Sequence, residues 1–161
     1  MGMNYIACSS TGNDMDTRFE SIGLYLPEKT VTTKEVVDQL SMSPPFDLSE
    51  ITGIQRRHVC AEHENTLSMA LEAARDCLDT SRYTAEELDC VISCSISRSL
   101  DNRYYFEPAM SLWIKNRLGA PQALNFDLSN ACAGMLTGVY VLDGLIKSGV
   151  VRNGMVVSAE K

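Results

Sequence analysis

The sequence lacks the features that mark several large classes of protein. Its 161 residues hold 14 lysines and arginines against 21 aspartates and glutamates, so the formal net charge is -7. No basic face is therefore available for a nucleic-acid backbone or an anionic lipid surface. No apolar run is long enough to cross a bilayer, and residues 1–18 lack the pattern of a secretory signal. We expect a cytoplasmic protein with neither a nucleic-acid nor a membrane partner.

Cysteine and histidine are also arranged without a metal-binding or disulfide pattern. The six cysteines show no paired CxxC spacing, and the chain has only two histidines. Neither a zinc site nor a disulfide framework is favoured, so we expect reduced thiols and no metal. With 45% hydrophobic residues, the chain is suited to one globular domain with a real core.

Strand-like and helix-like segments alternate along the chain after a polar N-terminal arm over residues 1–18. The hydrophobic patterns predict strands at residues 19–27, 53–61, 89–97, 122–129 and 154–160. Helical spacing predicts helices at 32–40, 65–81, 108–119 and 132–148, with a short helical turn at 84–88. Such alternation indicates an α/β fold with a mostly parallel or mixed sheet flanked by helices. The apolar run 89–97 predicts a strand covered on both faces.

Cys132 is the candidate nucleophile. It stands in the run SNACAG, where a strand gives way to a helix, and its neighbours are small. A cysteine in the first turn of a helix has its thiolate stabilised by free backbone N–H groups and by the helix dipole. Small neighbours leave room for a substrate carbonyl, and the backbone N–H of Cys132 can form half of an oxyanion hole. A lone cysteine among alanines is more often a small core residue, so further evidence is needed.

Several stretches in register carry a resemblance to a known family. The segment DLSNACAGMLTGVYVLDGLIKSGVVRNGMVVSAE resembles the nucleophile segment of the thiolase superfamily, most closely that of β-ketoacyl-acyl-carrier-protein synthase III. Upstream, GLYLPEKTVTTKEV, TGIQRRHVCAEHENTLSMALEAA and LDCVISCSIS resemble that family's opening strand and helix, its next motif and its third strand. The resemblance covers residues 19–161 and the N-terminal half of the family's fold only.

The resemblance implies a thiolase-like N-terminal domain, half of a five-layer αβαβα fold, in an acyltransferase of fatty-acid and lipid metabolism. Cys132 aligns with the acylated nucleophile. An acyl group carried by coenzyme A or an acyl-carrier protein passes to it, and a malonyl thioester then loses CO2 and attacks to give a 3-oxoacyl thioester. No cofactor is implied, and the enzyme is expected to be a homodimer.

The sequence departs from the family at two places. The family's acid/base His and its Asn belong to the C-terminal half, absent here, and we expect structural roles for His58 and His63. The isolated chain is therefore expected to be nearly inactive, because general acid–base catalysis alone is worth about a hundred- to ten-thousand-fold. Asp47 and Ile51 stand where the bacterial enzymes carry a Trp and an Arg that grip coenzyme A. The change favours an acyl-carrier protein, or a donor held in a different way, over coenzyme A.

Two other interpretations remain open. Tyr104, Tyr105 and Phe106 lie in the segment 97–110, which in this family lines the pocket of a dimer partner, but the same segment could be an ordinary loop leading into a helix. The whole chain could instead be related to 3-hydroxy-3-methylglutaryl-CoA synthase or to another thiolase-superfamily enzyme. It could also be a non-catalytic half that requires a partner subunit.

Whichever of these activities applies, an exposed apolar face is expected where a second half would dock.

Overall fold

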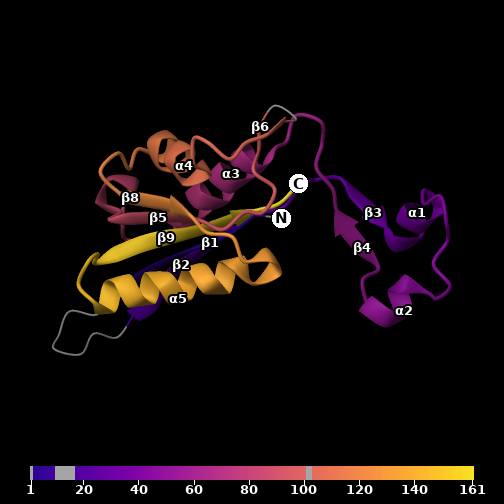
Figure 1. Cartoon of the computed structure of the whole chain (residues 1–161), viewed down its shortest axis with the longest axis horizontal. Coiled ribbons are helices and arrows are strands. Elements are labelled where there is room, and N and C mark those ends of the chain that lie inside the picture. The colour runs from indigo at the N-terminus through magenta and orange to yellow at the C-terminus, as the bar shows by residue number, and fades with distance from the viewer. Residues whose placement is uncertain (1, 10–16, 101–102) are drawn as a thin grey trace.

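A mixed five-stranded sheet organises the structure. The computed structural model describes residues 2–9, 17–100 and 103–161. The strands lie in the order β2-β1-β9-β5-β8 (Figure 1). Their bounds are β1 Gly2–Ser9, β2 Thr17–Tyr25, β5 Cys90–Ser93, β8 Leu124–Asp127 and β9 Asn153–Ala159. Strand β5 runs parallel to β8 and β9, whereas β1 runs antiparallel to β2 and β9, so the expected α/β sheet is confirmed in its mixed form.

The N-terminal arm is the main correction to the sequence analysis. We expected residues 1–18 to be a polar arm, but residues 2–9 form β1 near the middle of the sheet, and residues 10–16 lie outside the described part of the chain. Pairing on both sides supplies this strand's hydrogen bonds, and β preference depends strongly on such tertiary context. The sequence pattern of residues 2–9 alone does not show which strands will pair with them.

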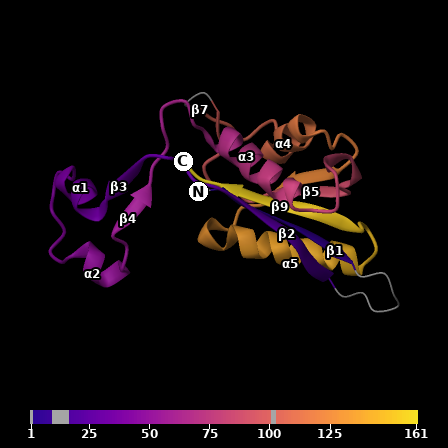
Figure 2. The ribbon, with the colours of Figure 1, turned by 180° about the vertical axis from the view of Figure 1, so that it is seen from behind.

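Helices cover the two faces of the sheet unequally. The helices α3, Thr66–Asp79, and α4, Met110–Leu118, lie on one face, and α5, Gly134–Lys147, lies alone on the other (Figures 1 and 2). Gly119 is the C-cap of α4 and Gly149 follows α5, each with the positive φ that glycine adopts at helix ends. All four residues of β5 are buried, which confirms that this strand is covered on both faces.

Two apolar layers form the core, one on each face of the sheet. The layer beneath α3 and α4 includes Leu67, Met69 and Ile114. The layer beneath α5 includes Leu142 and Ile146 together with Cys90 and Cys94. These thiols are packed in the core, and burial raises the pKa of each to about 11.

A small lobe stands apart from the sheet, and Figure 1 shows it beyond the ends of the strands. It consists of β3 Thr30–Thr32, α1 Thr33–Asp38, α2 Leu48–Thr52 and β4 Arg56–His58. Strand β4 is shorter than predicted and pairs with β3 in a separate two-stranded sheet. Thr32 caps α1 in a complete capping box, and α2, which was not predicted, follows its cap Asp47.

Four short elements complete the described chain. They are the 3₁₀ turn η1 Ala85–Glu87, the strands β6 Ser99–Leu100 and β7 Arg103–Tyr104, and the 3₁₀ turn η2 Ala131–Ala133. In the described part of the chain, no helix is long and apolar enough to cross a membrane.

Candidate active site

Cys132 lies exposed in a tight turn between β8 and α5. The predicted helix was expected to begin at Cys132, but α5 begins at Gly134 and the 3₁₀ turn η2 precedes it. Ala131 has a φ of 44°, a left-handed conformation that costs an ordinary residue about 1–2 kcal/mol. This bend places Cys132 just before the N-terminus of α5, where the helix dipole favours negative charge.

Two glycines seat α5 directly on the sheet. A Cβ atom on Gly134 would lie 2.9 Å from the carbonyl oxygen of Cys94, and one on Gly138 would lie 2.5 Å from the Cys94 Sγ. The small residues of this segment therefore permit a close approach of α5 to the backbone beneath it. Because Gly134 begins α5, the position of the turn is fixed relative to β5.

A ring of hydrogen bonds encloses the turn on both sides of Cys132. Asn130 Nδ2 donates to Thr137 Oγ1 at 2.8 Å, and that hydroxyl donates to the carbonyl oxygen of Ala133 at 2.9 Å. The N–H of Ala133 in turn donates to the carbonyl oxygen of Asn130 at 3.0 Å. In the sequence, Asn130 stands out only as part of SNACAG, and no local pattern indicates Thr137.

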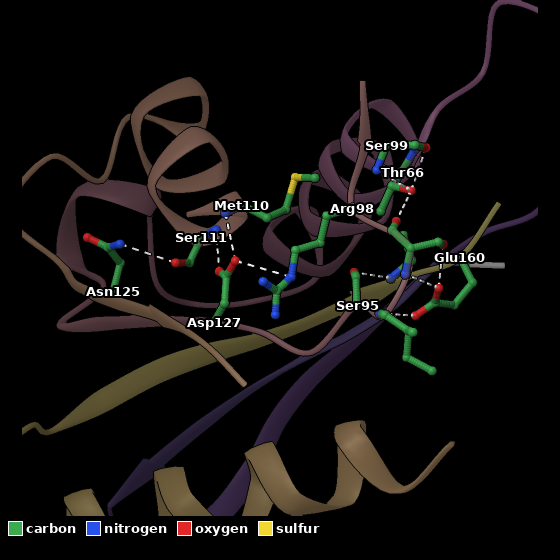
Figure 3. A network of polar contacts seen from close by, with 12 residues as sticks. Thr66, Ser95, Arg98, Ser99, Met110, Ser111, Asn125, Asp127 and Glu160 are labelled. Atoms are coloured by element: carbon green, nitrogen blue, oxygen red, sulfur yellow. Dashed lines mark hydrogen bonds and ion pairs between the residues drawn. The ribbon is translucent and has the colours of Figure 1, made fainter. Parts of the chain in front are cut away.

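Asp127 ties the end of β8 to the start of α4. Its carboxylate oxygens accept hydrogen bonds from the backbone N–H groups of Met110, at 2.8 Å, and Ser111, at 2.9 Å. The Nε of Arg98 lies 3.4 Å from Asp127 Oδ2, and both side chains are largely buried. Figure 3 shows the Asp127 carboxylate between the α4 N-terminus and the guanidinium of Arg98. The carboxylate thus supplies the cap that α4 otherwise lacks.

A second carboxylate, Glu160, fastens the loop that follows β5. It accepts from the backbone N–H groups of Ile96, at 2.6 Å, and Ser97, at 2.9 Å (Figure 3). Ser95 Oγ accepts from the N–H of Ala159 at 3.0 Å, so the loop is also tied to the end of β9. The two carboxylates together hold the segments at the carboxyl ends of the parallel strands, the edge where ligands bind in open α/β sheets.

The lobe joins the body at this same edge. Tyr25 Oη donates to Glu64 Oε1 at 2.6 Å, and this bond raises the pKa of Tyr25 to about 12 and lowers the pKa of Glu64. His58 Nδ1 donates to the carbonyl oxygen of Pro27 at 2.5 Å, which confirms a hydrogen-bonded structural role for this histidine. His63 lines an open hollow beside Tyr25 and Glu64.

The positions that were compared with a coenzyme A site face solvent on α2. Asp47 is the α2 cap and accepts from the N–H groups of Ser49 and Glu50, at 2.7 and 3.3 Å. These bonds, with that of the Ser49 hydroxyl, lower the pKa of Asp47. Ile51 is 67% exposed and Phe46 is 52% exposed. Asp47 thus serves the local helix, and no cation stands at position 51.

Large apolar side chains are exposed along α5 and the edge strand β2. Leu136 is 74% exposed and Tyr140 is 78% exposed, and both line a hollow of about 260 Å³ with Phe19 of β2. These side chains form an exposed apolar surface on α5 and β2. Tyr104 and Phe106, from the segment 97–110, are also exposed, while residues 101–102 lie outside the described chain.

The described residues hold no arrangement for a metal ion. Over residues 2–9, 17–100 and 103–161, no three His, Cys, Asp or Glu side chains gather as a metal site would require.

Comparisons with known proteins agree with the resemblance. The family model for 3-oxoacyl-[acyl-carrier-protein] synthase III matches residues 126–161, which include Cys132. The β-ketoacyl-[acyl-carrier-protein] synthase III of Acidiphilium cryptum is 35% identical over 144 residues, which are 89% of this chain and 43% of that protein. The chain matches the N-terminal part of synthase III proteins.

Solved structures extend the match to the fold. The synthase III of Aquifex aeolicus is 29% identical with a TM-score of 0.73, over 86% of this chain and 43% of that structure. The priming β-ketosynthase of a polyketide pathway is 28% identical with a TM-score of 0.76, over 88% of this chain and 40% of that structure. The thiolase-like fold is therefore confirmed, and the chain spans less than half the length of these synthase III relatives.

Proposed function

We propose that this chain is the N-terminal domain of an acyl-thioester condensing enzyme of the synthase III type and that Cys132 is its acyl-accepting nucleophile. The exposed position of Cys132 in a strained turn before α5 is the observation that carries the proposal. The turn falls inside the segment that matches the synthase III family model. A cysteine that served only the core would be buried, as Cys90 and Cys94 are.

The proposed reaction begins with acyl transfer. The thiolate of Cys132 adds to the carbonyl carbon of an acyl thioester, and the intermediate then expels the donor thiolate, which takes up a proton. The backbone N–H of Cys132 supplies one half of the oxyanion hole. A malonyl thioester then loses CO2, and the carbanion attacks the acyl carbonyl carbon, releasing the Cys132 thiolate and a 3-oxoacyl thioester.

Donor and partners form part of the proposal. The substrates are acyl thioesters of coenzyme A or of an acyl-carrier protein, and the reaction requires no cofactor. The absence of a cation at Ile51 and the capping role of Asp47 favour the carrier protein as donor. The enzyme acts in the cytoplasm as a homodimer, and the exposed rings of Tyr104 and Phe106 suit a dimer contact.

Intact-mass measurement after incubation with acetyl-CoA and with an acetylated carrier protein tests the acyl transfer. We expect the mass of one acetyl group on the unmodified protein and on Cys60→Ala, a matched control, because Cys60 is half-buried and its thiol contacts Met69 of α3. Cys132→Ala should not be labelled. Labelling that persists in Cys132→Ala, or no labelling of the unmodified protein by either donor, would contradict the proposal.

The condensation step is expected to stall in this chain by itself. The ring of His58 is held by the carbonyl oxygen of Pro27, and His63 lines the hollow beside Tyr25 and Glu64. Incubation of the acylated protein with a malonyl thioester should therefore give little 3-oxoacyl product by mass spectrometry. Many turnovers per protein molecule would show that residues of this chain complete the reaction.

A further inference from the structure

We infer that Asn130 and Thr137 are positioning residues for Cys132: their side chains close a ring of hydrogen bonds that holds the strained turn in the geometry needed for acyl transfer. This inference deepens the proposed function and rests on it. Neither side chain is placed among the reacting atoms. Each acts through the backbone on either side of Cys132, because Asn130 precedes the turn and Thr137 reaches the carbonyl of Ala133.

The ends of the turn are fixed by the sheet. On the strand side, the N–H of Leu128 donates to the carbonyl oxygen of Ser93 at 2.8 Å. On the helix side, Gly134 is buried against the backbone of Cys94. Residues 129–133 span the distance between these anchors, and all five are exposed to solvent. Core packing therefore contributes little to the shape of the turn.

The strained backbone of Ala131 must be held by local interactions. Ala131 holds a φ of 44° without being a glycine, and such a conformation persists only where surrounding interactions enforce it. The three bonds among Asn130, Ala133 and Thr137 enclose Ala131 and Cys132. If the ring opens, the turn can relax and the direction of the Cys132 N–H relative to its Sγ can change.

Acyl transfer and simple alkylation differ in how strictly they depend on the placement of the Cys132 Sγ and backbone N–H. Attack on a thioester requires the Sγ at the carbonyl carbon and the backbone N–H at the carbonyl oxygen at the same time. Iodoacetamide requires only an accessible sulfur. A positioning role therefore predicts that opening the ring slows acylation while alkylation continues at its usual rate.

The experiment compares the two reactions in Asn130→Ala, Thr137→Val and Thr137→Ser, with rates read by intact mass and folding checked by thermal unfolding. Misplacement of a reacting group by about an ångström lowers the reaction rate by up to about a hundredfold. Opening the ring should displace the Cys132 N–H by less than that, so we expect the acylation rate to fall about tenfold in Asn130→Ala and Thr137→Val. Thr137→Ser keeps the hydroxyl and should retain the normal rate. The double variant should be no slower than either single variant, because one open bond already opens the ring.

Asp143→Ala is the matched control, since this residue lies further along α5 and pairs with Lys147 at its surface. Normal acylation in Asn130→Ala and Thr137→Val would overturn the inference and leave the proposed function standing. Equal losses of acylation and alkylation would also overturn it, because they would indicate a change in accessibility. If the unmodified protein accepted no acyl group at all, the proposed function would fail and the inference with it.

Discussion

Replacing Gly138 by alanine tests how closely α5 is seated on the sheet. The new Cβ atom would lie 2.5 Å from Cys94 Sγ and 2.7 Å from Val156 Cγ1. Both side chains are buried in the layer beneath α5, so neither has open space to enter. Overpacking costs about 2 kcal/mol, and the higher helix propensity of alanine offsets about 1 kcal/mol of this. We expect a net loss of about 1 kcal/mol in the free energy of unfolding.

Gly144→Ala is the matched control for Gly138→Ala, because it makes the same change in the same helix. No atom lies within 4 Å of a Cβ at position 144, and this residue is exposed. The substitution should therefore stabilise the protein by about 0.5–1 kcal/mol through helix propensity alone.

Urea denaturation followed by circular dichroism measures both variants of α5. The expected gap of about 2 kcal/mol corresponds to about 4–8 °C in the midpoint of thermal unfolding for a domain of this size. If Gly138→Ala proved as stable as Gly144→Ala, the close seating of α5 would be refuted, and with it the argument that Gly134 and Gly138 fix the position of the Cys132 turn.

Three further predictions concern the groups around this edge of the sheet. Asp127→Ala leaves the buried Arg98 guanidinium without its carboxylate partner and removes the cap of α4. Urea denaturation should therefore show a loss of about 3 kcal/mol in the free energy of unfolding. A loss below about 1 kcal/mol would contradict the buried pair. Tyr25→Phe should cost about 1.5 kcal/mol at neutral pH. The Tyr25 hydroxyl holds the pKa of Glu64 below its ordinary value, so this bond stabilises the fold fully above the unfolded-state pKa of 4.5. The stability difference between Tyr25→Phe and the unmodified protein should vanish as the pH falls through the lower folded-state pKa. A stability difference that stays constant with pH would exclude this linkage. Iodoacetamide should modify exposed Cys132 well before Cys94, whose pKa burial raises to about 11; peptide mapping that finds equal rates would refute the assigned exposures.

Local signals account for the elements that the sequence predicted well. The Thr32 capping box and the glycine that ends α4 are decided by residues within a few positions of each helix end. The continuous apolar run gave β5 as a strand buried on both faces. By contrast, β1 depends on pairing with β2 and β9, and its partners on β9 lie about 150 residues further along the chain.

The candidate site also combines features that local sequence indicates with contacts that only the structure shows. Small neighbours and the strand-to-helix junction, which are local properties, make Cys132 a candidate, but the resemblance over residues 19–161 was needed to prefer it over a core cysteine. The cap that Asp127 supplies to α4 joins residues 17 positions apart and leaves no short-range pattern. The Asn130–Thr137 bond spans only 7 positions, but it depends on a 3₁₀ turn that the sequence did not predict. The polar contacts that shape the turn therefore required the structure.

The antiparallel strand β1 changes what surrounds Cys132. Gly2 pairs with Ala159 at the carboxyl end of β9 and with Tyr25 at the end of β2. The lobe that follows Tyr25 therefore leaves the sheet at the edge where β5, β8 and β9 end, which is the edge that carries Cys132. Had residues 2–9 remained an arm, β2 would have no partner in the sheet to hold the lobe there. The mixed topology, together with the Tyr25–Glu64 bond, is thus what brings α2 and the turn of Cys132 to one side of the molecule.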